Sequence, residues 1–116
     1  MSRIDRQLAD AQFSRIVAHD GVVHLAGQPA GNRDASTREQ TAEILASIDR
    51  LLAQAGTDKS RLLTVVIHLA DIREKAEMDA AWSAWADPAN LPARACVETR
   101  LNHPASRVMI RVTAAL

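Results

Sequence analysis

The sequence predicts an α+β fold in which a mixed β-sheet carries two helices on one of its faces. Segments with strand-like patterns and segments with helical spacing follow one another in the order β-β-α-β-α-β-β. Two of the strands each follow a helix, so placing both helices on the same face is the simplest packing. The length of 116 residues suits one core, and we expect a single domain spanning residues 1–116.

The first two strands are expected to form a β-hairpin. Residues 14–18 alternate polar and apolar side chains, and residues 22–26 are rich in β-branched ones. Between them lies Asp20-Gly21, a dipeptide that tight hairpin turns favour. The next stretch, residues 27–34, is rich in turn-forming residues and predicts a loop.

The following segment predicts a helix that ends before Gly56. Ser36 and Glu39 have the spacing of a capping box, in which the two side chains satisfy free amides at a helix start. Apolar residues then recur at helical spacing and form one stripe: Ile44, Leu45, Ile48, Leu51, Leu52 and Ala55. Gly56 stands where a left-handed residue commonly closes a helix.

A buried strand and a second helix are expected next. Leu62–Leu69 is a continuous β-branched and aliphatic run, which is typical of a strand covered on both faces. Asp71 is expected to cap the second helix, and Asp87-Pro88 to end it. One side of this helix carries large side chains that we interpret as core residues: Met78, Trp82 and Trp85.

Two alternating segments predict the last two strands. In residues 93–101 the alternation places four side chains on one face: Arg94, Cys96, Glu98 and Arg100. In residues 107–113 one face receives Val108, Ile110 and Val112, and the other receives Arg107, Met109, Arg111 and Thr113. With helices on one side of the sheet and arginines on the other, these patterns suggest an oligomer with polar sites at its interface.

The composition limits the classes of function. There are 14 Lys and Arg residues and 14 Asp and Glu residues, so we expect neither a nucleic acid nor a membrane as partner. Cys96 is the lone cysteine, which excludes an internal disulfide and a cysteine-based zinc site. The dispersed histidines lack metal-ligand spacing, and we expect no metal site. Residues 1–12 are polar and charged rather than an apolar signal segment, which favours a cytoplasmic location.

One segment points to a binding site. Arg94 closely follows Pro92 on a predicted strand, and a rigidly placed guanidinium can grip a carboxylate through two parallel hydrogen bonds. Cys96 lies two residues further on and therefore on the same face. The alternative is a surface pair between Arg94 and Glu98 beside a small packed cysteine.

Several motifs resemble the RidA (reactive intermediate deaminase A) family, which is also called YjgF-like or endoribonuclease L-PSP-like. They match in order and spacing across nearly the whole chain: Ala26-Gly27-Gln28, Gln40-Thr41, Leu69-Ala70-Asp71, Trp82 and the string P-A-R-A-C-V-E that begins at Pro92. The resemblance implies a chorismate-mutase-like fold, a homotrimer and a pocket between adjacent subunits. It also implies hydrolysis of 2-imino acids or their enamine tautomers to 2-keto acids and ammonia, without a metal or an organic cofactor.

The same resemblance implies roles for individual residues. Arg94 matches the arginine that binds the substrate carboxylate, and Cys96 matches the cysteine beside the reacting carbon. Gly27 belongs to the matching Gly-Gln pair and is expected to line the pocket. Asp79 matches an asparagine on the helix that also lines the pocket.

The chain departs from the family pattern at three further positions. Met109 stands where the family has a glutamate that positions or activates the attacking water. Phe13 replaces a pocket tyrosine and lacks its hydroxyl, and Ala26 replaces a serine. A thioether cannot accept a proton at neutral pH, whereas a positioned acid or base contributes roughly 10²–10⁴-fold to a reaction rate.

Two functions therefore stay open. The first is a hydrolase of 2-imino acids or enamines that uses Arg94 for binding and a water held by Cys96 and backbone groups. The second is a non-catalytic module that binds or senses a small carboxylate-bearing metabolite, such as a 2-keto acid or a dicarboxylate. RNA cleavage has little support, because the net charge is zero and no paired histidines occur.

The charges near Met109 also admit two interpretations. If Arg107 and Arg111 open into the same pocket, the site suits a ligand with more than one acidic group. Alternatively, Glu98 neutralises Arg111. Either Glu98 or Asp79 could take over the missing acid–base role.

Overall fold

The framework of the molecule is a mixed sheet, which the computed structural model describes within residues 3–116. Its strands are β1 (Asp5–Ala9), β2 (Ser14–His19), β3 (Val22–Leu25), β4 (Gln28–Pro29), β5 (Leu62–Leu69), β6 (Ala93–Glu98) and β7 (Val108–Ala115). They lie in the order β1-β2-β3-β7-β5-β6, and the short β4 also pairs with β7. Strands β5 and β6 run parallel, and the other neighbours are antiparallel.

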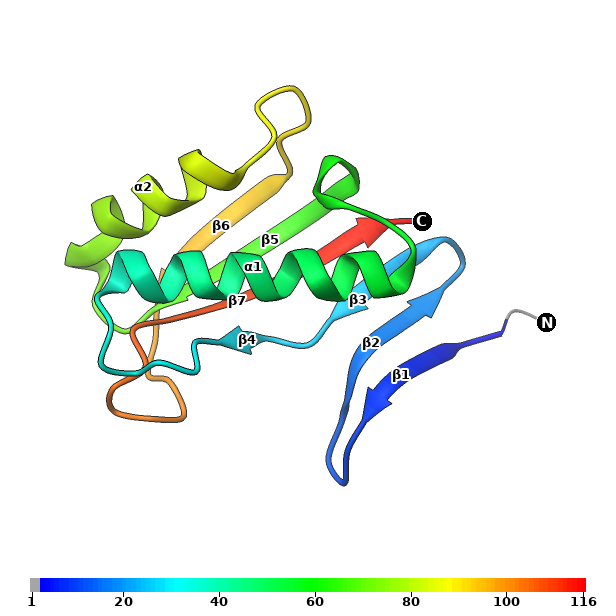
Figure 1. Ribbon diagram of the computed structural model, residues 1–116, viewed down its shortest axis with the longest axis horizontal. Helices are drawn as coiled ribbons and strands as arrows, with labels where there is room; N and C mark the ends of the chain where they lie inside the picture. Colours follow the sequence, from blue (N-terminus) through cyan, green and yellow to red (C-terminus); the bar gives the residue numbers. More distant parts are fainter. Residues whose placement is uncertain (1–2) are drawn as a thin grey trace.

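Two helices lie side by side on one face of this sheet (Figure 1). They are α1 (Thr37–Ala55) and α2 (Lys75–Trp85), and short 3-10 turns occur at Lys59–Arg61 and Ile72–Glu74. The predicted α+β architecture, a mixed sheet with both helices on the same side, is therefore confirmed.

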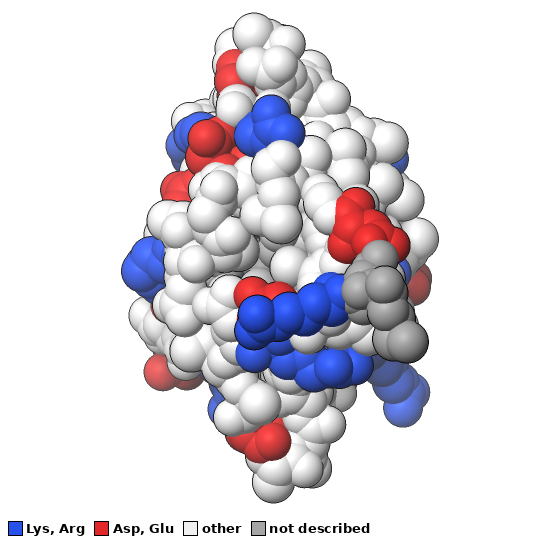
Figure 2. Space-filling model, turned by 90° about the vertical axis from the view of Figure 1, so that its right-hand side faces the viewer, with Lys and Arg blue, Asp and Glu red and all other residues white. Residues whose placement is uncertain are grey.

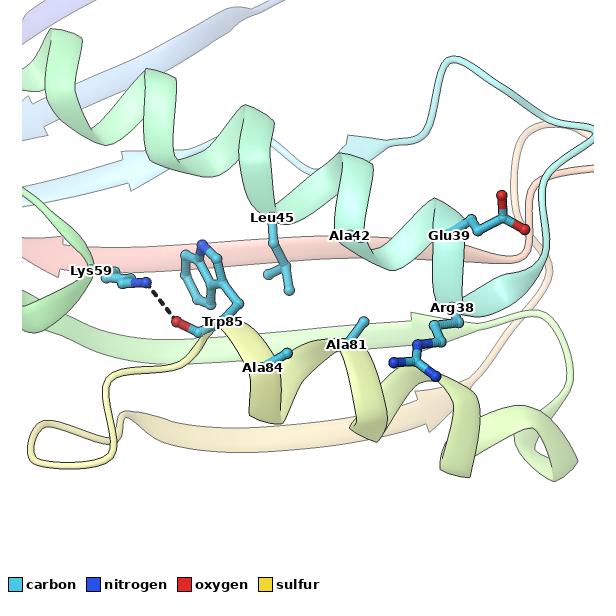
Figure 3. A pocket seen from close by; sticks show the side chains of 8 residues that line it. All are labelled: Arg38, Glu39, Ala42, Leu45, Lys59, Ala81, Ala84 and Trp85. Carbon is cyan, nitrogen blue, oxygen red and sulfur yellow. Dashed lines mark hydrogen bonds between the residues drawn. The ribbon is translucent and has the colours of Figure 1, made fainter.

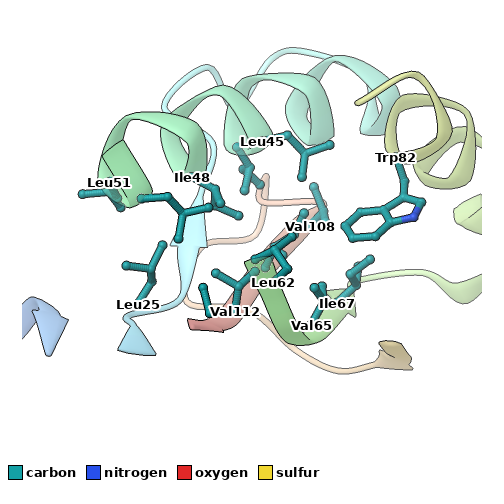
Figure 4. Packing of buried hydrophobic residues seen from close by; sticks show 14 of the residues in the cluster. Leu25, Leu45, Ile48, Leu51, Leu62, Val65, Ile67, Trp82, Val108 and Val112 are labelled. Carbon is teal, nitrogen blue, oxygen red and sulfur yellow. The ribbon is translucent and has the colours of Figure 1, made fainter. Parts of the chain in front are cut away.

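The core fills the space between the helices and the sheet (Figure 4). The helices contribute Ile44, Leu45, Ile48, Leu52 and Met78, all with at most 1% of their surface exposed. The strands contribute Ile16, Val23, Val65, Ile67, Leu69, Val108, Ile110 and Val112. Trp82 is 7% exposed and packs in the same cluster, which confirms its assignment to the core.

The ends of α1 follow the sequence signals. The Ser36 Oγ atom accepts a hydrogen bond from the Glu39 amide at 3.1 Å and donates one to the Glu39 carboxylate at 2.9 Å. Gly56 closes the helix with a φ of 90°, and its amide donates to the Ala53 carbonyl. A left-handed residue at this position is far easier for glycine than for a residue with a Cβ atom.

The predicted hairpin is also confirmed. Strands β2 and β3 pair antiparallel, and Asp20 and Gly21 between them have φ values of 49° and 79°. Two successive positive φ angles characterise the tight turn that matches the twist of the flanking strands.

Three local expectations were wrong. β1 is an additional strand, which the polar sequence of Asp5–Ala9 did not indicate because it is an edge strand paired only with β2. β4 lies in the expected loop and pairs with β7 for only two residues, too few to produce a pattern. Asp71 caps the 3-10 turn Ile72–Glu74 through the Arg73 amide, so α2 begins later, at Lys75.

Charge is unevenly distributed on the surface that includes the right-hand end of Figure 1. Lys and Arg side chains gather there in one band, and most of the remaining surface in this view is uncharged (Figure 2). Among residues 3–116, neither helix combines the length and the apolarity that a crossing of a lipid bilayer requires.

Candidate functional site

The register of the strands places Arg94 and Cys96 on the helix-covered face of the sheet. Arg94 pairs with Val65 of β5, and Cys96 pairs with Ile67. Side chains of directly paired residues point to the same face, and both β5 residues belong to the core beneath the helices. The sequence expectation that Arg94 and Cys96 share a face is therefore confirmed.

Met109 and Arg111 of β7 point to the opposite face. They flank Ile110, which is fully buried in the core, and alternation along the strand turns its neighbours away. No helix among the described residues covers this second face, which we call the open face. Within one chain, Arg94 and Met109 therefore cannot line the same pocket.

Helix α2 supplies the partners of Arg94, and we call Lys75, Asp79, Trp82 and Arg94 the Arg94 cluster. The Arg94 Nη1 atom donates to Asp79 Oδ1 at 2.9 Å, and Lys75 Nζ donates to Asp79 Oδ2 at 2.6 Å. The guanidinium carbon lies 5.5 Å from the centre of the Trp82 ring, within the range of a cation–π interaction. These contacts fix the position of a guanidinium whose side chain is 24% exposed.

Only one nitrogen of this guanidinium is engaged by the described residues. Nη1 makes the bond to Asp79 and lies 3.8 Å from the Met78 sulfur. The planar fork carries five N–H donors, so its Nε and Nη2 edge still offers two parallel donors to a carboxylate.

Ion pairs keep Asp79 ionised, whereas burial keeps Cys96 protonated. Partial burial raises the pKa of Asp79, but hydrogen bonds from Lys75 and Arg94 lower it more, so this pKa lies below its ordinary value. Burial raises the pKa of the Cys96 thiol, and the nearby positive charges oppose this only in part. At neutral pH Cys96 is therefore a thiol that can donate a hydrogen bond rather than a thiolate nucleophile.

The remaining predicted site residues meet at a hollow of about 490 Å³ on the open face. Its lining is Phe13, Ala26, Gly27, His68, Asn102, Met109 and Arg111, and we call it the open-face hollow. Gly27 leaves room there for Met109, because a Cβ atom at this position would lie 2.9 Å from the Met109 sulfur and the methionine side chain would have to move. Among residues 3–116, no three His, Cys, Asp or Glu side chains are grouped so that they could hold a metal ion.

The expectation that Glu98 neutralises Arg111 is wrong. Its carboxylate accepts a hydrogen bond from the Ile72 amide at 3.1 Å. Glu98 also pairs with the core residue Leu69, which places it on the helix-covered face, away from Arg111. It therefore does not neutralise Arg111.

The alternative surface pair between Arg94 and Glu98 does not form either, because Asp79 takes the Arg94 guanidinium instead. Arg107 is likewise not part of the open-face hollow. Its Nη1 atom pairs with the Glu74 carboxylate at 3.0 Å, just before α2 begins. Arg111 is therefore the cationic residue that joins Met109 in that hollow.

Sequence reasoning missed Lys75, His68 and Asn102. Lys75 and Asp79 have the i, i+4 spacing of a helical ion pair, a signal that was present in the sequence. The placement of His68 depends on its pairing with Met109 across two strands that lie 39 residues or more apart in the chain. No local pattern contains that information.

A further hollow of about 380 Å³ lies between α1 and α2 (Figure 3). Its lining consists of Arg38, Glu39, Ala42, Leu45, Lys59, Ala81, Ala84 and Trp85. Lys59 Nζ donates to the Trp85 carbonyl at 2.6 Å and lies over the Trp85 ring. This hollow contains none of the site residues that the sequence predicts.

Solved structures share this architecture, and they define the class as small α+β proteins of the YjgF type. A YjgF-family protein from Neisseria meningitidis is 42% identical, with a TM-score of 0.95 over 97% of this chain and 94% of that one. A structure from Salmonella typhimurium, described as a putative translation initiation inhibitor, is 35% identical, with a TM-score of 0.90 over 97% of both chains.

The sequence gives the family directly. The model of the Endoribonuclease L-PSP family matches residues 4–116, and the chain belongs to that family. The RutC family protein YoaB of Escherichia coli (strain K12) is 40% identical over 114 residues, which are 98% of this chain and 96% of that protein. A RutC family protein of Haemophilus influenzae is 39% identical over 112 residues, covering 96% and 97% of the two chains. The resemblance seen in the sequence is thereby confirmed.

Proposed function

We propose that this protein binds a 2-imino acid, or its enamine tautomer, between adjacent subunits of a homotrimer and hydrolyses it to a 2-keto acid and ammonia. The observation that carries the proposal is the geometry of Arg94. Asp79 and Trp82 fix the guanidinium, while its Nε and Nη2 edge stays available for a substrate carboxylate.

The charge of the Arg94 cluster supports a carboxylate ligand. Lys75 and Arg94 each carry one positive charge, and the ionised Asp79 carries one negative charge. The cluster therefore has a net charge of about +1, which one substrate carboxylate neutralises. In this proposal Asp79 acts on the substrate through Arg94 rather than by touching it.

The separation of the two groups supports assembly from several copies. Arg94 and Cys96 lie on the helix-covered face of the edge strand β6, whereas the open-face hollow lies on the other side of the sheet. A site that combines them needs the edge of one subunit beside the hollow of the next. Apolar residues that such contacts can cover are exposed, including Phe13 at 52% and Val97 at 42%.

Each residue of the proposed pocket has a separate role in binding or hydrolysis. Arg94 holds the substrate carboxylate, and the Cys96 thiol lies beside the imine carbon as a hydrogen-bond donor. Phe13, Ala26 and Gly27 shape the hollow, and Arg111 keeps it positively charged. No metal or organic cofactor is needed, because water attacks an already electrophilic carbon.

A binding module without turnover is the second candidate, and the lining of the open-face hollow favours it. Met109 supplies a thioether where hydrolysis needs a group that handles water, and no carboxylate lines this hollow. Arg94 of one subunit and Arg111 of the next would then hold a 2-keto acid or a dicarboxylate. A cytoplasmic location and the absence of a nucleic-acid partner remain predictions from composition.

The test is the hydrolysis rate of a 2-imino acid generated in situ by an amino acid oxidase. We expect turnover by the wild type and a loss of roughly 100-fold or more in Arg94→Ala, because two charge-assisted hydrogen bonds disappear. Arg50→Ala, on the exposed side of α1, is the matched control and should keep full activity.

Two results would contradict the proposal. An inert wild type that still binds 2-keto acids by calorimetry would favour the binding module. Sedimentation of a stable monomer at micromolar concentration would remove the shared pocket altogether.

A further inference from the structure

The open-face hollow contains one side chain that can act as a general acid or base, the imidazole of His68. The other lining residues do not serve as proton acceptors, because they carry apolar side chains, a neutral amide or a guanidinium: Phe13, Ala26, Gly27, Met109, Asn102 and Arg111. The remaining residue, His68, carries an imidazole, the side chain best suited to general acid–base catalysis at neutral pH.

The sheet register brings His68 next to the position where the family has its glutamate. His68 of β5 pairs directly with Met109 of β7, and both point to the open face. Directly paired residues of antiparallel strands have Cβ atoms about 4.5–5.5 Å apart. The His68 imidazole on β5 can therefore reach nearly the same position in the hollow as a carboxylate at residue 109 of β7 would.

The His68 imidazole has no partner within the part of the chain that the structure describes. The ring nitrogens of His68 take part in none of the hydrogen bonds or ion pairs formed among residues 3–116. The residue is half-buried, and neither ring nitrogen is buried without a partner. Both nitrogens are thus free to bind a water molecule in the hollow.

The other candidate acid–base groups are engaged in ways that remove them from this role. The Asp79 carboxylate is bound by two cations. The Glu98 carboxylate accepts from the Ile72 amide on the helix-covered face. The Cys96 thiol is a poor base because burial raises its pKa.

We propose that His68 is the catalytic acid–base residue of this protein and takes the role that the family gives to the glutamate at the Met109 position. This inference rests on the proposed imine hydrolysis. It specifies which group activates the water and why a methionine is tolerated at position 109.

The steps balance in protons and electrons. Neutral His68 removes a proton from water as the water oxygen bonds to the iminium carbon, and the C=N π electrons move to nitrogen to give a neutral carbinolamine. The imidazolium returns this proton to the amine nitrogen. His68 then takes the hydroxyl proton as the C=O bond forms and the C–N bond breaks, and the released ammonia carries that proton away as ammonium.

The experiment compares wild type, His68→Asn, Met109→Glu and the double variant in the imine hydrolysis assay. We expect His68→Asn to lower kcat by about 100-fold or more while KM changes less than about threefold. The double variant should regain at least about tenfold of the lost kcat, because the new carboxylate occupies the neighbouring position. A purely structural role of His68 would not produce that recovery.

His24→Asn is the matched control. His24 is an exposed histidine on the open face of β3 and lines a neighbouring hollow, which shares Arg111 with the open-face hollow but contains neither His68 nor Met109. The same substitution should therefore leave kcat unchanged. Circular dichroism and sedimentation establish that each variant folds and assembles. If His68→Asn fails to fold, His68→Gln replaces it in both the single and the double variant.

The outcomes separate this inference from the proposed function. If Arg94→Ala abolishes turnover but a folded His68→Asn keeps it, the hydrolase proposal stands and the role of His68 is refuted. If the wild type is inert and Met109→Glu alone confers turnover, His68 does not act as the base, and the native protein is a binding module. If neither Arg94→Ala nor His68→Asn changes the rate, both proposals are wrong.

Discussion

The Arg94 cluster and the open-face hollow differ in how many of their contacts one chain provides. One chain provides the contacts of Arg94, because α2 supplies the ion-pair partner Asp79 and the aromatic ring of Trp82. The open-face hollow has no covering helix among the described residues, and its Arg111 is exposed. Under the proposed function, folding of one subunit builds the first half of the site, and assembly would complete the second half.

The largest effect on activity is expected when the Arg94 cluster is damaged in one chain and the open-face hollow in another. Arg94→Ala damages the cluster, and Gly27→Val fills the hollow against the Met109 sulfur. Each homotrimer should be inactive, but random mixed trimers contain one interface that pairs an intact cluster with an intact hollow. Co-expression should therefore restore about one quarter of wild-type activity.

The matched control for this test mixes the two purified homotrimers without subunit exchange, which should restore nothing. Inactive mixed trimers, shown by mass spectrometry to contain both chains, would mean that the two halves do not cooperate across an interface.

The next largest effect concerns the stability of the two faces of β5. Ile67 is fully buried under the helices, and Ile67→Ala should lower the free energy of unfolding by about 2–5 kcal/mol. Val66 points to the open face and is only half-buried in the single chain, so Val66→Ala should cost less than about 1.5 kcal/mol. Urea denaturation of both variants measures the difference. A large loss in Val66→Ala that grows with protein concentration would show that the open face is buried by assembly.

A smaller effect is expected from the charge of Asp79. Asp79→Asn removes the carboxylate that competes for Arg94, so a 2-keto acid should bind about threefold to tenfold more tightly. Glu77→Gln is the matched control, because Glu77 is an exposed carboxylate on the same helix and takes part in none of the ion pairs among residues 3–116. Calorimetry measures both affinities. Weaker binding by Asp79→Asn would mean that positioning Arg94 matters more than competing for it.

The smallest effect is the pH dependence of the same ion pairs. The pKa of Asp79 is lowered in the folded protein, so its contribution to stability is present above the ordinary value of 3.8 and is lost as pH falls through the folded pKa. The side chain is 34% exposed and therefore screened, so the contribution is roughly 0.2–1 kcal/mol. The stability difference between wild type and Asp79→Asn should therefore be constant above about pH 5 and shrink mainly as pH falls below the ordinary value of 3.8. A difference that stays constant from about pH 5 to about pH 2 would exclude ionisation as its cause.

Local patterns were sufficient for much of the fold. The Ser36 cap, the apolar stripe and Gly56 predicted α1, because caps and helical periodicity act over a few residues. The Asp20-Gly21 turn and the continuous apolar run at Leu62–Leu69 predicted the hairpin and the central strand for the same reason. β1 and β4 were missed because their own sequences carry no strand pattern. β1 forms by pairing with the neighbouring β2, and β4 forms by pairing with the distant β7.

Local patterns predicted less of the candidate site than of the fold. The sequence identified Arg94, Cys96, Met109 and Arg111, and alternation grouped each pair correctly. It could not show that the two pairs lie on opposite faces, because that depends on how β6 and β7 are registered against β5. The position of α2 gives Arg94 its partner Asp79, and the register of β6 against β5 places Glu98 on the face opposite to Arg111.

The sequence by itself therefore determined both helices, five of the seven strands and the family, since periodicity and motif spacing are properties of the chain. Only the tertiary structure decided which residues meet. Contacts such as Arg94 with Asp79 and His68 with Met109 join segments 15 to 41 residues apart, and strand register and helix packing bring those segments together.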